Sequence, residues 1–535
     1  MNSLQEKELE RTARQTYIDS NMGAAARNKL GQFATPPALA QEIAEYAGAL
    51  WKKRKDKIRF FEPALGTGAF FSALVRRLPA GRIERATGVE INPDMAKLAQ
   101  ELWKDSGLEV INSDFTSLAV PSDEGHFNLI MTNPPYVRHH HLNQDQKVRL
   151  KAKASSITKS DLSGLAGLYC YFILLCDDWL ADEGLGIWLV PSEFMDVNYG
   201  AVIKEYLLEQ VTLLHIHRFD PAELQFDDAL TSSAIVVYQK TRPNGEYRVE
   251  FSYGGSLQQP AKRAMLSSSE LAGCRKWSGL GENWKGTNSH SSVGVDEPTL
   301  SSIFMIKRGI ATGANNFFIL PRARALALGI DERFLKPILP SPRYLEDAVV
   351  EADENGYPRI DKPSALIDTD LPEEVLKRVC RPLWEYLRTG EEQGVRDTYL
   401  AGKRSPWYRQ EHRDAAPFVC TYMGRPGKAG SPFRFLWNKS RAVAPNVYHL
   451  LYPVGPLKVA LEKRPELAQQ VFALLQQIES ATLVSEGRVY GGGLYKLEPN
   501  ELGRVGARHF EDMLEPYYQM QPDRQIGLFD VVQAG

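Results

Sequence analysis

The sequence lacks the features of a zinc-binding, membrane-spanning or secreted protein. Its five cysteines form no Cys-x-x-Cys pair, and no histidine stands at zinc-ligand spacing from them. The longest uninterrupted apolar stretch, residues 168–176, is far shorter than the ~18 residues that a membrane span needs. The first residues alternate in charge from Glu6 onward and lack the apolar core of a signal peptide. We therefore expect a protein of the reducing cytoplasm, with no membrane partner and no metal.

Strong net charge is also missing. The formal net charge is −2, so any site for a polyanion must be a local patch. No cysteine follows a proline, which argues against the Pro-Cys nucleophile that acts on a cytosine carbon. A length of 535 residues predicts two or three domains, and 43% hydrophobic with 24% charged residues predicts sizeable cores.

The first half of the chain is organised around residues 127–137, FNLIMTNPPYV. An apolar run of strand character stops at Asn133, which is followed by Pro134 and Pro135. Neither proline can donate to a sheet ladder, so Asn133 is expected at the open end of a strand. In open α/β sheets this end is where ligands bind.

The residue types at this strand end fit chemistry on an amino group. A nucleobase amino group is a poor nucleophile because its lone pair is delocalised into the ring. The side-chain carbonyl of Asn133 and the backbone carbonyl of Pro134 could accept both amino hydrogens as the nitrogen attacks a methyl donor. Tyr136 could stack on the ring. An isolated Asn-Pro-Pro-Tyr is more often a plain strand end with a proline turn, so the upstream sequence has to decide.

A glycine-rich loop follows the first predicted strand, residues 58–61. This loop, residues 62–70 (EPALGTGAF), places Gly66 and Gly68 between a strand and a helix, where the backbone can approach a ligand closely. The loop has no Gly-Lys-Ser/Thr and is therefore not a phosphate cradle. A Gly-x-Gly pair alone is weak evidence.

Acidic residues, Glu90 and Asp114, follow two further predicted strands, residues 86–89 and 109–112. Glu90 lies 22 positions after Gly68, where an acidic residue usually binds a ribose diol, and Ile91 beside it can contact the base. Asp114 can accept from an adenine amino group, and Phe115 can stack. Four successive strand ends thus carry ligand-binding residue types, a combination that an ordinary sheet does not explain.

The neighbouring segments give weaker signals. Residues 1–29 are polar and alanine-rich, and we expect one helix with little function of its own. Residues 31–37 (GQFATPP) predict a turn before an amphipathic helix, with Thr35 either capping that helix or contacting a ligand. The triplet His139, His140 and His141 is consecutive and cannot converge on one metal ion, so a loop facing solvent or polyanion is expected. Further helices are expected at about residues 168–180 and 197–208, and strands at 186–190, 211–218 and 233–239.

After about Arg242 the alternation of strands and helices stops, which predicts a domain boundary. Between residues 402 and 441, nine Lys or Arg stand against Glu411 and Asp414, with seven aromatic residues among them. Cations interleaved with aromatics suit a surface that faces nucleic acid, but a β-rich core with solvated arginines would have the same composition. Two glycine-rich turns, residues 308–313 and 490–495, could approach a phosphate backbone.

In this order, the motifs resemble those of the gamma class of adenine-specific DNA methyltransferases of type II restriction-modification systems, which are TaqI-methyltransferase-like. The resemblance covers about residues 32–240 and implies an α/β fold. It implies a helical extension at residues 1–30, a Rossmann-like S-adenosylmethionine-dependent catalytic domain at 31–243 and a mixed α+β target-recognition domain at 244–535. The motifs that carry it are QFATPP (32–37), EPALGTG (62–68), VEI (89–91), SDF (113–115) and NPPY (133–136).

The resemblance implies transfer of a methyl group from S-adenosylmethionine to N6 of a flipped adenine in double-stranded DNA. Its catalytic residues would be Asn133, Pro134, Tyr136 and Phe226, where Phe226 is the second aromatic around the base or, alternatively, a core anchor for its loop. The cofactor contacts would be Thr35, Glu62, Gly66, Gly68, Glu90, Ile91, Asp114 and Phe115. Residues 421–425 further resemble the XhoI specificity group, which reads CTCGAG. A cognate restriction endonuclease would be a separate protein, and the methyltransferase is expected to be a monomer.

Two other classes remain open. Asn-Pro-Pro-Tyr also occurs in enzymes that methylate the glutamine amide of release factors and in some RNA guanine methyltransferases, because each acts on a planar amino group. The basic and aromatic second half favours DNA over a peptide amide. A non-catalytic DNA-binding protein on the same scaffold is disfavoured by the intact motif, and a donor-binding titration would separate the two.

Overall fold

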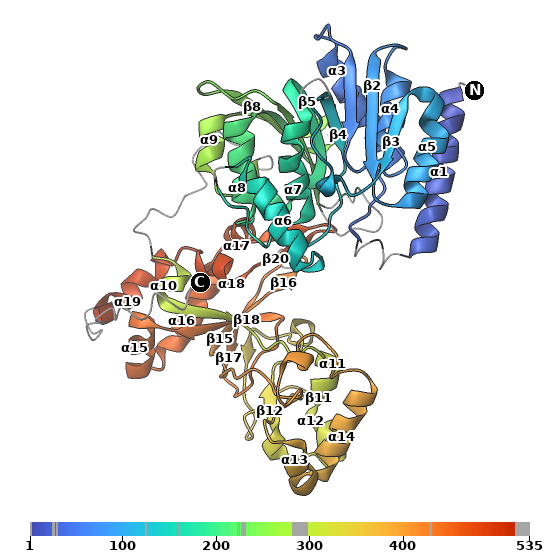
Figure 1. The fold of residues 1–535 in the computed structure, drawn as a ribbon. Coiled ribbons are helices and arrows are strands. Elements are labelled where there is room, and N and C mark those ends of the chain that lie inside the picture. Colours follow the sequence, from blue (N-terminus) through green and yellow to red (C-terminus); the bar gives the residue numbers. More distant parts are fainter. Residues whose placement is uncertain are drawn as a thin grey trace. The chain divides into compact units, whose positions relative to one another are not determined.

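The computed structural model describes residues 3–23, 27, 30–122, 126–158, 160–221, 223, 225, 232–280, 298–426 and 431–518. The chain forms two compact units, whose elements are labelled in Figure 1. The first comprises Met1–Thr287 with Tyr490–Gly493, and the second comprises Asn288–Val489 with Leu494–Gly535. None of the described helices is long and apolar enough to cross a membrane.

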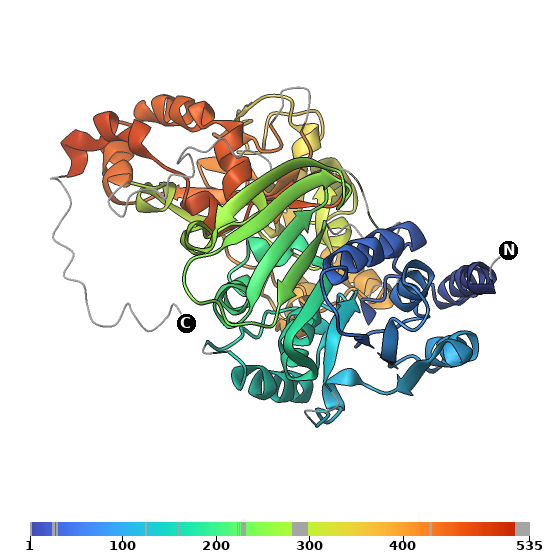
Figure 2. The ribbon, with the colours of Figure 1, turned by 90° about the horizontal axis from the view of Figure 1, so that it is seen from above.

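A nine-stranded sheet forms the centre of the first unit, seen from a second direction in Figure 2. Its first five strands are parallel, whereas β7 runs antiparallel to both β5 and β6. The strand order reverses between β1 and β4, and at such a point the carboxyl ends of the two strands flank a ligand-binding crevice. The order is β3 (Leu108–Asn112), β2 (Ile83–Glu90), β1 (Ile58–Glu62), β4 (Phe127–Thr132), β5 (Leu180–Pro191), β7 (Ser233–Gln239), β6 (Thr212–Arg218), β8 (Arg248–Gly255) and β9 (Pro260–Ser267).

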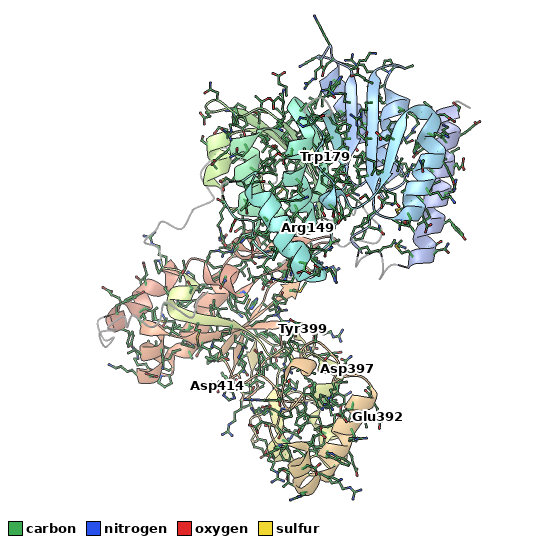
Figure 3. The ribbon with its side chains drawn as sticks, in the orientation of Figure 1. Arg149, Trp179, Glu392, Asp397, Tyr399 and Asp414 are labelled. Atoms are coloured by element: carbon green, nitrogen blue, oxygen red, sulfur yellow. The ribbon has the colours of Figure 1, made fainter. Side chains whose placement is uncertain are left out.

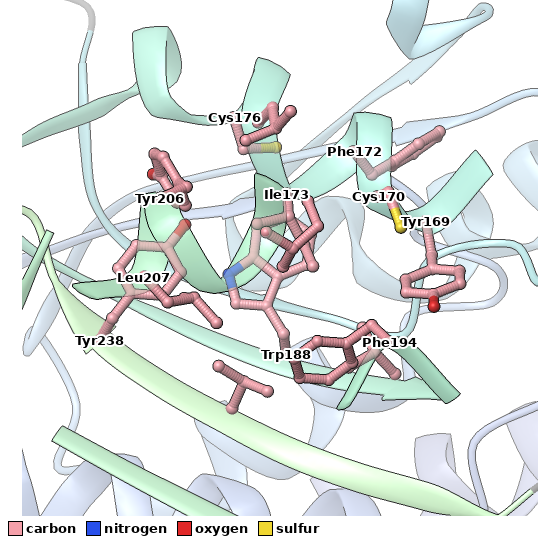
Figure 4. Packing of buried hydrophobic residues seen from close by; sticks show 14 of the residues in the cluster. Tyr169, Cys170, Phe172, Ile173, Cys176, Trp188, Phe194, Tyr206, Leu207 and Tyr238 are labelled. Carbon is pink, nitrogen blue, oxygen red and sulfur yellow. The ribbon is translucent and has the colours of Figure 1, made fainter. Parts of the chain in front are cut away.

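Helices cover both faces of this sheet because its central strands are apolar on both sides. Leu129 of β4 packs with α3 (Pro37–Trp51), α4 (Ala69–Arg77) and α5 (Pro93–Trp103), while Ile130 packs on the other face with α7 (Leu168–Leu175) and α8 (Gly200–Glu205). On this second face, Trp188 of β5 lies among Ile173, Leu207 and other apolar side chains (Figure 4). Burial on both faces is typical of parallel sheets.

Two predictions for the first unit need correction. The N-terminal helix α1 (Ser3–Met22) ends before residue 29, because Gly23 adopts a left-handed conformation with φ of 70°. The predicted domain end at residue 243 falls between β7 and β8 of one sheet. The sheet continues past this point, because β8 pairs in parallel with β6 and antiparallel with β9.

The second unit is a mixed α+β structure with several smaller cores. Its longer helices include α14 (Arg381–Glu392), α15 (Gly455–Lys463) and α16 (Leu467–Gln477). One sheet has the order β10 (Phe304–Arg308), β18 (Tyr448–Pro453), β15 (Phe418–Thr421), β17 (Phe435–Asn438) and β13 (Val349–Val350). Two three-stranded sheets have the orders β11 (Ile319–Pro321), β14 (Ser364–Ile367), β12 (Leu335–Ile338), and β16 (Met423–Gly424), β20 (Leu494–Lys496), β19 (Arg488–Tyr490).

Candidate active site

Asn133 follows β4 directly, and its side-chain amide is fixed in one orientation. Its Nδ2 donates to the backbone oxygen of Phe33 at 2.9 Å and to Thr35 Oγ1 at 3.2 Å. Its Oδ1 is buried and accepts no hydrogen bond from the described residues. A buried carbonyl without a donor is costly, so this strand end presents an acceptor that a bound amino group can satisfy.

Thr35 does not cap the helix that follows it. The N-cap of α3 is Pro36, which makes no side-chain cap bond, and Pro37 at the first helical position has no N–H to satisfy. The capping interpretation was therefore wrong. The hydroxyl instead accepts from Asn133 and so orients the strand-end amide.

Tyr136 is held from several sides. Its N–H donates to the Gly31 oxygen at 2.9 Å, and its Oη donates to the Leu189 oxygen at 3.2 Å. Burial raises the pKa of its phenol, which therefore stays neutral. Gly31 has a φ of 61°, and a Cβ there would lie 2.5 Å from the Tyr136 backbone. The turn before α3 thus packs backbone to backbone on the Asn-Pro-Pro-Tyr segment.

Two carboxylates lie at the ends of β1 and β2. Glu90 accepts from the N–H of Gly66 and the N–H of Asn92, both at 2.7 Å. Burial raises the pKa of Glu90 despite these two donors. Glu62 is buried, and its Oε2 has no partner among the described residues. Burial and the nearby Glu90 raise the Glu62 pKa well above its ordinary value. This pair suits a ligand that brings hydrogen-bond donors or positive charge.

The glycine loop has the backbone that its sequence predicts. Gly66 and Gly68 have φ values of 56° and 85°, in the left-handed region that favours glycine. A Cβ on Gly68 would lie 2.8 Å from Trp103 Nε1, whereas a Cβ on Gly66 would meet nothing within 4 Å. Beside this loop, Ile91 is 64% exposed. The loop therefore has open space at Gly66, and an apolar side chain near it is available to a flat ring.

Asp114 and Phe115 are less available than expected. Asp114 Oδ1 accepts from Thr116 N and Oγ1 at 2.9 and 2.8 Å, and Oδ2 lies 3.4 Å from Arg149 Nη2. Arg149 comes from α6 (Gln144–Ser155), where Figure 3 labels it. The Phe115 ring is 4% exposed and packs against Phe61, Phe172 and Trp179. It is a core residue that offers little of its face for stacking.

Two other predicted features are the role of Phe226, which stays a prediction, and the loop at the histidine triplet. Phe226 lies outside the described residues. His139–His141 form a 3-10 helix, and among the described residues no group of three or more His, Cys, Asp or Glu is placed to hold a metal ion.

Helix α1 contributes to the glycine loop, which was not expected from its polar, alanine-rich sequence. Glu8, Arg11 and Gln15 are its buried residues, spaced so that they share one helix face. Arg11 and Gln15 hydrogen-bond to Thr67 in the glycine loop. The signal available in the sequence was this recurrence of polar residues on one helix face. Charged residues are rarely buried unless they are paired.

The aromatic residues of segment 402–441 do not line a surface. Phe418 and Tyr408 are 0% exposed, and of the seven aromatics only Trp437 is half-buried rather than buried. Several cations have protein partners: Arg404 donates to the oxygens of Ala311 and Thr312, and Lys439 pairs with Glu351 at 2.7 Å. The aromatics fill cores beneath exposed cations, as the alternative interpretation of this segment required.

The glycine-rich turns also contact the protein's own backbone. A Cβ on Gly309 would lie 2.2 Å from the oxygen of Pro445. In the turn at residues 490–493, the N–H of Gly492 donates to the oxygen of Pro221 at 2.8 Å. Close approach at these glycines therefore serves packing, and the phosphate contact predicted for them has no support here.

A cavity of about 520 Å³ lies where β5 begins and β7 ends, at the end of these strands opposite to the one that carries Asn133. Its lining includes Asp177, Asp178 and Lys240. Lys240 donates to the oxygens of Asp177 and Leu180, so it fastens the start of β5. The chemistry-bearing residues at the end of β4 do not reach this cavity.

Comparisons with known proteins agree with this arrangement. Residues 291–516 match the type II methyltransferase M.Eco57I C-terminal domain, and residues 80–225 match the Eco57I restriction-modification methylase. These matches support a methyltransferase of the type II restriction-modification systems. S-adenosylmethionine is accordingly its cofactor. The buried unpaired oxygen of Glu62, the carboxylate of Glu90 and the open loop at Gly66 fit the ammonium and ribose hydroxyls of that molecule.

Relatives cover most of the methyltransferase. The type II methyltransferase M.AccI of Acinetobacter calcoaceticus is 27% identical over 495 residues, which cover 89% of this chain and 85% of that protein. M.XamI of Xanthomonas campestris pv. amaranthicola is 26% identical over 493 residues, which cover 91% of this chain and 86% of that protein. The structure of the type IIL restriction-modification enzyme MmeI in complex with DNA aligns with a TM-score of 0.52 and 12% identity, covering 91% and 73%. This last similarity shows a shared fold.

Proposed function

We propose that this methyltransferase is a site-specific DNA adenine methyltransferase, which methylates N6 of an adenine flipped out of double-stranded DNA. The product would be protected from a separate restriction endonuclease. The observation that carries the proposal is the buried Oδ1 of Asn133, which accepts no hydrogen bond from the part of the chain that the structure describes, in an amide fixed by Phe33 and Thr35. An acceptor held in this way suits an exocyclic amino group.

The cofactor would be held by the ends of β1 and β2. Glu90 would accept from the ribose hydroxyls, Ile91 would cover the adenine ring, and Glu62 would face the positively charged methionine end. Gly66 and Gly68 allow the backbone to approach it, and Asp114 and Phe115 would bound the adenine at its edge. S-adenosylmethionine supplies an electrophilic methyl group on its sulfonium.

The chain's own groups would activate the target nitrogen. Asn133 Oδ1 and the Pro134 oxygen accept its two hydrogens, which holds the lone pair toward the methyl group. As the N–C bond formed and the bond from the methyl group to the sulfonium sulfur broke, leaving a neutral thioether, the nitrogen would gain positive charge, which the two carbonyl dipoles would stabilise. The nitrogen afterwards loses one proton to solvent. These preorganised dipoles need no reorientation, because Asn133 is already tied to Phe33 and Thr35.

The target adenine would have to leave the duplex, because a paired amino group cannot reach a strand end inside the protein. Tyr136 is placed beside Asn133 and is fixed by its bonds to Gly31 and Leu189, so it can stack on the extruded base without losing side-chain freedom. Phe226 would supply the opposite face.

Three observations favour DNA over a peptide amide or RNA as substrate. Residues 291–516 match the C-terminal domain of a type II methyltransferase, and a solved relative is a restriction-modification enzyme in complex with DNA. In the second unit, several lysines and arginines of segment 402–441 are exposed. No comparable observation favours the other substrates.

The direct experiment is product analysis. Plasmid DNA is incubated with the protein and isotopically labelled S-adenosylmethionine, hydrolysed to nucleosides and analysed by mass spectrometry. Labelled N6-methyladenine is expected. Labelled N4-methylcytosine, or label in protein or RNA in place of DNA, would contradict the proposal. A panel of restriction enzymes, starting with one that cuts CTCGAG, then identifies the protected sequence.

A further inference from the structure

Helix α1 buries polar side chains. Glu8, Arg11 and Gln15 are 7%, 2% and 8% exposed, and they are the buried residues of this helix. Its apolar Leu4 and Ile18 are only partly buried. Burying a charged pair contributes little net stability compared with apolar side chains of the same size. The hydrophobic effect alone therefore does not explain why these residue types occupy the buried face.

The buried side chains of α1 hydrogen-bond to the glycine loop and to α4, the helix that follows the loop. Arg11 Nη1 donates to Thr67 Oγ1 at 3.0 Å, and Thr67 Oγ1 donates to Gln15 Oε1 at 2.7 Å. Glu8 accepts from Arg11 at 2.7 Å and from Ser72 Oγ of α4 at 2.6 Å. Burial alone would raise the Glu8 pKa, but the bonds and charge of Arg11 lower it, so the pair is ionised.

Thr67 stands between the two left-handed glycines of the loop. The loop backbone is fixed by Glu90, which accepts from Gly66, and by Trp103 Nε1, which donates to the Thr67 oxygen at 3.0 Å. Among the described residues, the Thr67 hydroxyl hydrogen-bonds only to Arg11 and Gln15 of α1. Glycine gives a loop many alternative conformations, so these contacts select one of them.

Arg11 also acts on the carboxylate at the base of the site. Its positive charge lowers the Glu62 pKa, against the effects of burial and of Glu90. The same guanidinium therefore fixes the loop and favours the charged form of the residue that faces the cationic end of the cofactor.

We propose that α1 is part of the cofactor site and that Arg11 is its positioning residue, which holds Thr67 and with it the glycine loop in the shape that binds S-adenosylmethionine. The inference rests on the cofactor and on no particular methylated base. Linkage requires reciprocity: if docking of α1 raises cofactor affinity by some factor, bound cofactor must favour docking of α1 by the same factor.

The first test compares two arginines of the same helix. Arg14 pairs with Glu101 on the exposed side, at 2.8 Å, and does not reach the loop. Arg11→Met should weaken S-adenosylmethionine binding, measured by calorimetry, by about tenfold or more, in the range of coupled sites. Arg14→Met should change it by less than about twofold, because exposed pairs contribute little. Equal affinities in the two variants would overturn the proposal.

Arg11→Met leaves Glu8 buried without its partner and can lower stability, so a second variant acts from the loop side. Thr67→Val removes the hydroxyl that Arg11 and Gln15 bind and alters no charge. It should weaken cofactor binding to a similar extent. The double variant should bind the cofactor no more weakly than the weaker-binding single variant, because both substitutions remove the same interaction. Additive losses of affinity would show independent effects.

Hydrogen exchange supplies a readout other than catalysis. Amides of residues 8–15 should exchange several-fold more slowly in the wild-type protein with the non-reactive product S-adenosylhomocysteine, and this protection should disappear in Thr67→Val. Protection that is absent in the wild type would refute the coupling. If the wild type binds cofactor but makes no N6-methyladenine, the proposed function fails while this inference stands.

Discussion

The strand ends of the first unit and segment 402–441 of the second are both clusters of polar and aromatic residues. They differ in the kind of buried hydrogen-bonding atom that has no partner among the described residues. At the strand ends, Asn133 and Glu62 each keep a buried oxygen without a partner among the described residues. In segment 402–441, Arg404 and Lys439 are bonded to protein groups, and Phe418 is fully buried. The strand ends thus keep buried acceptors for a ligand, whereas the buried atoms of segment 402–441 that have no partner among the described residues are the donors Trp407 Nε1 and Arg413 Nε.

This difference separates two kinds of evidence for function. A buried acceptor without a donor costs free energy that a fold alone has no reason to retain, so it points to a ligand. A run of cations and aromatics is compatible with a core and its solvated surface. The buried acceptors at the strand ends therefore indicate a bound ligand. The composition of segment 402–441 indicates DNA binding less strongly.

The largest expected effect tests whether an aromatic of segment 402–441 is core. Phe418 is fully buried and packs on Phe304 at 6.0 Å between ring centroids. Phe418→Ala should lower the free energy of unfolding of the second unit by about 3–5 kcal/mol, measured by chemical denaturation. Tyr399→Ala, at a ring that is 74% exposed, should change it by less than about 0.5 kcal/mol. Weaker DNA binding by Phe418→Ala at unchanged stability would contradict the comparison.

A slightly smaller effect tests the incomplete site. Asn133→Ala removes one of two proposed acceptors and should lower kcat by about 10²–10³-fold, as for the loss of one preorganised dipole. Cofactor affinity, measured separately, should be unchanged. Asn143→Ala is the matched control, because this exposed asparagine caps α6 through Gln146 and lies outside the proposed site. It should cost about 1 kcal/mol of stability and leave kcat intact.

The sequence predicted the strand ends well because each depends on local features. An apolar run that stops at Asn133 before two prolines can only end a strand there, and Gly66 and Gly68 need the left-handed backbone they adopt. The parallel sheet followed from the alternation of such strands with helices. These features involve residues that are neighbours in the chain.

The sequence could not predict contacts between distant residues. Thr35 was expected either to cap the next helix or to contact a ligand, but its hydroxyl meets Asn133, 98 positions away. Arg11 meets Thr67 at a separation of 56 positions. Phe115 was expected to face the cofactor, yet its ring packs on Phe172, which comes from another helix. The boundary at residue 243 failed for the same reason, since β8 adds to the sheet beside the non-adjacent β6.

The third prediction asks whether the turn at Gly31 shapes the site. Gly31→Ala would place a Cβ 2.5 Å from the Tyr136 backbone and should lower kcat by about 10–100-fold, because small displacements of reacting groups are costly. Gly81→Ala is the control: its φ of 79° is also left-handed, but its Cβ would meet nothing within 4 Å. It should cost only the ~1–2 kcal/mol of backbone strain. Similar kcat values in both variants would show that the close approach of Gly31 to Tyr136 does not affect catalysis and that only the left-handed backbone requires glycine.

The smallest effect asks whether the exposed cations of segment 402–441 bind DNA at all. The side chain of Arg409 is exposed and has no ion-pair partner among the described residues. If it contacts a phosphate, Arg409→Ala should weaken binding to specific and non-specific duplexes alike and reduce the slope of log affinity against log salt by about 1. Arg381, which pairs with Glu385 on α14 at 2.8 Å, supplies the control, and Arg381→Ala should leave that slope unchanged. An unchanged slope in Arg409→Ala would mean that Arg409 is only solvated. A loss confined to specific duplexes would instead mean that Arg409 contacts a base, because phosphate contacts carry no sequence information.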